Sequence, residues 1–186
     1  MLALEVTAQT PMPYVERADG PIVFCAGGSD PEGALETMAA WCGYLVKTRD
    51  WVFLAPKGLL AWRCIPPWAT CRPFAEDGWK YLRNASLVVT MFGQMMYECL
   101  WWQTPVVAFA RTASDAKAIL RLQHVGVNPV PSDDLPLWPT MTQQRFCATV
   151  AAHMDEGMRH AMSTVSTGLL DGQGVARVAD AILVLT

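Results

Sequence analysis

The sequence predicts an α/β protein with a doubly wound, mostly parallel sheet. Short apolar runs of strand length alternate along the chain with longer segments whose apolar residues recur at helical spacing. Glycine turns follow two of these runs, at Gly27-Gly28 and at Gly93. This alternation is typical of parallel sheets that are covered by helices on both faces.

The first half of the chain is predicted to hold an arm, two strands and a helix. Residues 1–20 include two prolines and little periodicity, so we expect an arm or linker before one domain over residues 21–186. Pro21–Ala26 and Trp51–Leu54 are predicted strands. The helix between them, which Ser29 or Asp30 would cap, has an apolar stripe of Leu35, Met38, Ala39, Cys42, Leu45 and Val46.

The second half is predicted to continue the alternation. The predicted helices are Phe74–Asn84, Gln94–Trp102, Ala113–His124, Gln143–Glu156 and Val175–Leu185. The predicted strands are Leu87–Val89 and Val106–Phe109, with shorter candidates at Leu59–Ile65 and Gly126–Val130. Residues 129–140 contain four prolines and are expected to form a loop.

Composition excludes several classes of function. The chain has 186 residues, of which 52% are hydrophobic and 17% charged, as in a single globular domain. A net charge of −3 gives no basic surface for nucleic acid. No apolar run reaches the roughly 18 residues of a membrane span, and the N-terminus has no signal-peptide pattern, so we expect a cytoplasmic protein.

Cysteine and histidine spacing gives no sign of metal or triad chemistry. The six cysteines form no C-x-x-C pair, so reduced thiols are expected. His124, His153 and His160 have no acid at a telling spacing, and we expect them on helix surfaces. No metal or cofactor is therefore expected, and no catalytic residue can be assigned.

The two glycine turns are candidates for a ligand site. Gly27-Gly28, with Ser29 and Asp30, either presents backbone N–H groups to a phosphate or forms a plain turn. Gly93 opens the predicted helix in which Glu98 lies about one turn from the start. Strand–glycine–helix turns of βαβ units hold anions and nucleotides, but the absence of G-x-G-x-x-G argues against NAD.

Four segments together resemble the C-terminal half of GT-B glycosyltransferase-like proteins. They are PIVFCAGGSDPEG (21–33), FAEDGWKYLRNASLVVT (74–90), FGQMMYECLWWQTPVVAF (92–109) and LDGQGVARVADAIL (170–183). The chain is most similar to the UDP-sugar hydrolase of pseudaminic acid synthesis and to spore-coat polysaccharide proteins, with the peptidoglycan N-acetylglucosaminyltransferase a more distant relative. The resemblance implies a Rossmann-like domain that binds UDP or a UDP-sugar.

The resemblance also implies a role for each matching residue. Glu98 matches the carboxylate that binds the ribose hydroxyls. The backbone that meets uracil matches Phe74 and Ala75, and the loop that meets the diphosphate matches Gly93, Gln94 and Met95. The first glycine loop matches Gly27, Gly28, Ser29 and Asp30. The family's other half carries the catalytic base. Because only about 20 residues precede Pro21, we expect either that a separate chain supplies this half or that the domain acts without it.

A non-catalytic domain is the alternative. The family has small and hydroxyl residues before the glutamate, where this chain has Met91, Phe92 and Met95. In this reading Phe92 or Met95 plugs the glycine loop, and a surface rich in Trp and Met serves homodimerisation or partner binding. Arg111 and Lys117 lie near the predicted cleft, where each could contact a phosphate or simply be solvated.

Overall fold

The computed structural model describes residues 10–28, 30, 32–45, 49–56, 66–74, 77–128 and 135–184. Within them, five strands form one sheet in the order β3-β2-β1-β4-β5, and every pairing is parallel. The strands are β1 (Ile22–Cys25), β2 (Trp51–Ala55), β3 (Thr70–Pro73), β4 (Leu87–Met91) and β5 (Val106–Phe109). The predicted doubly wound α/β class is confirmed.

The strand order creates a switch point between β1 and β4. From β1 the chain proceeds outward to β2 and β3, and then returns to place β4 on the other side of β1. Ile22 pairs with Leu87 and Cys25 with Thr90, so the carboxyl ends of the two strands lie together. Open α/β sheets bind their ligands at such a point, because the helices that follow the two strands leave toward opposite faces.

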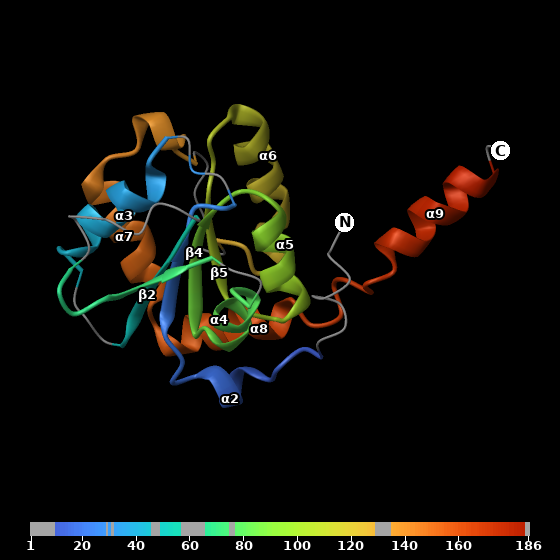
Figure 1. Ribbon diagram of the computed structural model, residues 1–186, viewed down its shortest axis with the longest axis horizontal. Coiled ribbons are helices and arrows are strands. Elements are labelled where there is room, and N and C mark those ends of the chain that lie inside the picture. The colour runs from blue at the N-terminus through green and yellow to red at the C-terminus, as the bar shows by residue number, and fades with distance from the viewer. Residues whose placement is uncertain are drawn as a thin grey trace.

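Helices cover both faces of the sheet (Figure 1). Phe24 and Val89 pack with the face that carries α3 (Ala34–Cys42) and α7 (Gln143–His153). Val23 and Val88 pack with the opposite face, which carries α4 (Trp79–Asn84), α5 (Gln94–Trp101) and α6 (Ala113–Leu122). Burial on both faces explains why β1, β2, β4 and β5 are largely apolar runs without alternation.

The remaining elements lie around this core. The arm contains α2 (Tyr14–Arg17), and two 3₁₀ turns are η1 (Gln123–Val125) and η2 (Trp138–Thr140). Arg17 is buried and donates to the carbonyl of Trp102 at 2.7 Å, so the described part of the arm is tied to the domain. Near the C-terminus are α8 (Glu156–Val165) and α9 (Gly174–Val184).

α9 projects away from the three-layer body (Figure 1). Its side chains Val178, Ile182 and Leu183 are 51%, 57% and 71% exposed. The predicted C-terminal helix is thus present, with its apolar residues facing outward. Among the described residues no helix has the length and apolar character needed to cross a membrane.

The structure corrects several predicted boundaries. The helix predicted from Phe74 begins at Trp79, because the Phe74 N–H donates to the Ala55 carbonyl at 2.6 Å and extends the strand pairing. The helix predicted to reach Glu156 ends at His153, and α8 starts anew after Asp155, whose side chain accepts from the Met158 N–H.

Two strand predictions have different outcomes. Of the candidate strand Gly126–Val130, Val127 makes a single bridge to Val106, and residues 129–130 lie outside the described chain. The candidate at Leu59–Ile65 also lies outside the described residues. β3, which follows Pro66-Pro67, was not predicted.

His153 is buried, at 1% exposure, and the prediction of a surface position for it was wrong. Its Nδ1 lies 2.7 Å from the Thr149 carbonyl oxygen, one turn earlier in α7. Burial lowers the pKa of His153, so the fold favours its neutral form.

Candidate functional site

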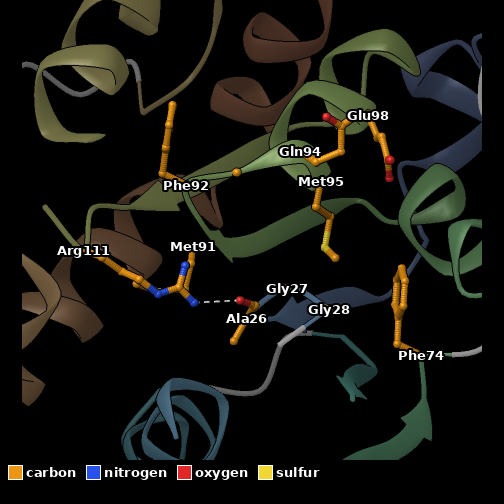
Figure 2. A pocket seen from close by; sticks show the side chains of 11 residues that line it. Ala26, Gly27, Gly28, Phe74, Met91, Phe92, Gln94, Met95, Glu98 and Arg111 are labelled. Carbon is orange, nitrogen blue, oxygen red and sulfur yellow. Dashed lines mark hydrogen bonds between the residues drawn. The ribbon is translucent and has the colours of Figure 1, made fainter. Parts of the chain in front are cut away.

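A cavity of about 330 Å³ opens at the carboxyl ends of β1 and β4 (Figure 2). The predicted site residues that line it are Gly27, Gly28, Phe74, Gly93, Gln94, Met95 and Glu98. Ala26, Met91, Phe92 and Arg111 complete its wall. Ser29 and Ala75 lie outside the described residues. Segments far apart in the sequence therefore meet here.

The first glycine loop leaves β1 and forms one side of the cavity. Gly27 has a φ of 106°, a left-handed conformation that favours glycine. A Cβ added at Gly28 would meet no atom within 4 Å, so the backbone here borders open space. Asp30 is on the same loop but does not line the cavity: its two carboxylate oxygens accept from the N–H groups of Ala34 and Leu35 at 2.8 and 2.9 Å. Asp30 thus fastens the loop to α3.

The second glycine turn presents the N-terminus of α5 to the cavity. No side chain of the described chain caps this helix at Gly93. By contrast, Thr112, Thr142 and Asp155 cap α6, α7 and α8. A helix N-terminus carries partial positive charge and outward N–H donors, so the uncapped α5 terminus is suited to an anion.

Glu98 lies one turn into α5, where it is half-buried at the cavity wall. Burial raises the pKa of Glu98, and a hydrogen bond with the Gln94 side chain opposes that shift. Figure 2 shows the two side chains beside each other on α5. An ionised carboxylate only accepts hydrogen bonds and has room for two donors, which fits a pair of hydroxyl groups.

The bulky residues of the second turn leave the cavity open. Met91 and Met95 are 2% and 8% exposed and belong to the packed cores on the two faces of the sheet. Phe92 turns toward Tyr97, with ring centroids 6.2 Å apart in an edge-to-face arrangement. The plug that the non-catalytic alternative expects is therefore not seen among the described residues.

Arg111 is the cation among the described residues of the cavity wall. It follows β5, and its Nη2 reaches across β4 to donate to the Ala26 carbonyl at 2.9 Å. Its Nε lies 3.4 Å from a carboxylate oxygen of Glu32. Sequence reasoning gave Arg111 little weight, although its place directly after a strand puts it at the same sheet edge as both glycine turns. Lys117 is exposed on α6 and does not line the cavity.

The described residues contain no group of three or more His, Cys, Asp or Glu side chains that could hold a metal ion. The polar groups that the cavity does bring together are the two glycine turns, Gln94, Glu98 and Arg111. This arrangement can bind an anion and a hydroxyl-bearing group side by side.

No protein-family model matches the chain, and no curated protein is significantly similar to it in sequence. Solved structures are similar in fold. MurG of Acinetobacter baumannii matches with a TM-score of 0.67 and 15% identity, over 98% of this chain and 53% of MurG. The calicheamicin glycosyltransferase CalG4 matches with a TM-score of 0.60 and 17% identity, over 95% of this chain and 46% of CalG4.

A Listeria monocytogenes protein assigned as a UDP-N-acetylglucosamine 2-epimerase also matches, with a TM-score of 0.61 and 15% identity, over 92% of this chain and 46% of that protein. This chain thus spans about half the length of each of these structures. At these identities the likeness shows the fold, which is that of one Rossmann-like half of a GT-B glycosyltransferase.

Proposed function

We propose that this chain binds a nucleotide-sugar, with UDP as the nucleotide. The observation that carries the proposal is the open cavity at the switch point, which joins two glycine turns, an uncapped helix N-terminus and a half-buried carboxylate. A nucleoside diphosphate fits this site, because its anionic phosphates suit the glycine turns and the helix N-terminus while its ribose hydroxyls suit the carboxylate.

The diphosphate is assigned to the two glycine turns. Backbone N–H groups at the start of α5 and on the Gly27-Gly28 loop would donate to its oxygens. Gly93 and Gly28 allow close approach, since an added Cβ at either position would stand in open space. Gln94 and Met95 contribute the first turn of α5.

The nucleoside is assigned to the opposite end of the cavity. Glu98 would accept hydrogen bonds from the two ribose hydroxyls, and charge-assisted bonds of this kind are the stronger ones. Phe74 lies beyond Glu98, where its backbone would meet the base. The choice of UDP is supported by the resemblance described above and by the UDP-sugar in the name of the Listeria protein.

We do not assign catalysis to this chain alone, but to its combination with a second domain. We place this chain in a glycosyltransferase-like or UDP-sugar hydrolase-like protein of surface-polysaccharide metabolism, in which a second domain supplies the catalytic base. The shared fold and the half-length coverage of MurG and CalG4 support this placement.

A second candidate function is the binding of a protein partner or of another copy of this chain. The exposed apolar residues of α9 favour it, because single-chain proteins seldom leave a projecting helix with such side chains in water. The two functions are compatible, since α9 projects away from the sheet (Figure 1) and contributes none of its described residues to the cavity wall.

Calorimetric titration with UDP, UDP-N-acetylglucosamine and ADP tests the proposal. We expect binding of the uridine nucleotides in preference to ADP, and at least tenfold weaker UDP binding by Glu98→Gln, because a charge-assisted hydrogen-bond pair is lost. Asp180→Asn, an exposed carboxylate change on α9, is the matched control and should bind as the wild type does. Equal binding of UDP and ADP, or no binding at millimolar ligand, would contradict the proposal.

A further inference from the structure

We infer that Arg111 determines the specificity of this site by binding an anionic group that the ligand carries beyond its α-phosphate. We also infer that Glu32 occupies Arg111 until that group arrives. The inference rests on the proposed nucleotide site and concerns which ligands the site prefers.

The position of Arg111 gives the first argument. Figure 2 shows its guanidinium on one side of the cavity and Phe74 on the other, with Gly27 and Gly28 between them. A nucleotide whose base is near Phe74 and whose ribose is on Glu98 directs its phosphates toward the glycine turns. Whatever follows the α-phosphate is then the part of the ligand that comes nearest to Arg111.

Charge gives the second argument. Among the described lining residues, Arg111 and Glu98 are the two charged side chains, and they have opposite sign. Guanidinium groups bind phosphate and carboxylate with paired hydrogen bonds, and they bind neutral hydroxyl groups less strongly. The Arg111 end of the cavity therefore favours an anion, while the Glu98 end favours hydroxyl donors.

The present partners of Arg111 give the third argument. Its Nη2 has a well-formed bond to the Ala26 carbonyl, which fixes the guanidinium at the cavity wall. Its Nε is buried and makes no hydrogen bond among the described residues, since the Glu32 carboxylate at 3.4 Å is an ion-pair contact only. Glu32 is itself 41% exposed, so the pair is weak and a ligand anion can replace it.

Two ligand groups share the required chemistry. One is the β-phosphate of a nucleoside diphosphate, and the other is a carboxylate on the attached sugar. Four ligands distinguish the two groups. UDP adds a second phosphate to UMP, UDP-glucose adds a neutral sugar to UDP, and UDP-glucuronic acid carries an acidic sugar instead.

Calorimetric titration of these four ligands tests the inference. The proteins compared are wild type, Arg111→Met, Glu32→Gln and the control Lys117→Met. We expect Arg111→Met to weaken UDP and UDP-sugars about tenfold while UMP changes little. Selective weakening of UDP-glucuronic acid alone would assign Arg111 to a sugar carboxylate. Glu32→Gln should tighten the same ligands that Arg111→Met weakens, and Lys117→Met should change none.

Four results would overturn all or part of the inference. Equal weakening of all four ligands by Arg111→Met would mean that Arg111 only supports the Ala26 loop. Unchanged UDP and UDP-glucuronic acid binding in Arg111→Met, with wild type binding both, would overturn the inference and leave the proposed function intact. No binding of any uridine nucleotide by wild type would overturn both. Unchanged binding in Glu32→Gln would overturn the role of Glu32.

Discussion

At the residue scale, Glu98 is a carboxylate that the fold holds half-buried at the cavity wall. Burial raises its pKa above the ordinary value of 4.5. α5 would be more stable with a neutral residue at position 98, because burial removes water from the carboxylate and so disfavours its charged form. Groups with such shifts are concentrated at functional sites, which agrees with the proposed ribose contact.

The stability of the ligand-free protein should therefore rise when Glu98 is changed to Gln. A raised pKa in the folded state means that the charged carboxylate destabilises the fold at neutral pH. This penalty should diminish as the pH falls through the raised pKa, and it should vanish below about 4.5, where the folded and unfolded chains are both protonated. We expect Glu98→Gln to melt about 2 °C higher than wild type at neutral pH and at the same temperature in acid.

Thermal unfolding across this pH range, without nucleotide, measures the difference. Asp180→Asn again serves as the exposed control and should show no such crossover. A Glu98→Gln variant that melts lower than wild type at neutral pH would show that the bond between Glu98 and Gln94 is structural, and it would remove this support for a binding role.

At the element scale, the N-terminus of α5 has a glycine that the fold does not require but that a ligand would. A Cβ at Gly93 would meet no atom within 4 Å, and the backbone there is extended, so folding does not require glycine. Gly126 differs, because it has a φ of 94° and an added Cβ would lie 2.7 Å from the Met162 carbonyl oxygen. The fold therefore requires glycine at position 126 but not at position 93.

Gly93→Ala should consequently change the free energy of unfolding by no more than about 0.5 kcal/mol while it weakens UDP binding at least tenfold. The added methyl group would stand where the diphosphate approaches the backbone. Gly43→Ala, at the end of α3, is the control that should affect neither property, and Gly126→Ala should destabilise the protein. Denaturant unfolding and calorimetry check both properties; full UDP affinity in Gly93→Ala would contradict the assignment of the diphosphate.

The sequence could predict elements that are buried on two faces. Leu87–Val89 and Val106–Phe109 are apolar runs because helices cover both sides of the sheet, and their strands were predicted within two residues. β3 has mostly exposed residues and little apolar pattern, so no periodicity marks it. α8 was not predicted: the predicted helix stopped at Glu156, the residue at which α8 begins after the cap at Asp155.

The candidate site was predictable where it depends on position after a strand. Gly27, Gly93 and Glu98 follow strands whose carboxyl ends meet, and the structure brings all three to one cavity. Arg111 was a candidate because of its place after a strand, but its bond to the Ala26 carbonyl was not predictable, because that bond depends on a side chain that crosses β4. Asp30 was one of the two caps predicted for α3, and its carboxylate does accept from the Ala34 and Leu35 N–H groups.

At the scale of the whole molecule, the domain has the fold of one half of a two-domain protein. Its cavity is open on the side where the carboxyl ends of β1 and β4 meet, and MurG and CalG4 are about twice as long as this chain. This open side agrees with the proposal that a second domain closes over the sugar. The central claim is that a uridine nucleotide binds at this edge of the sheet.

Amide chemical-shift mapping by NMR during a UDP titration tests that claim most directly. We expect saturable shifts for Gly27, Gly28, Gly93 and Glu98, with the amides of α8 and α9 unchanged. Arg111 should join the affected set with UDP and be less affected with UMP. Shifts centred on any other face of the domain, or no shifts at millimolar UDP, would show that uridine nucleotides do not bind at this edge of the sheet.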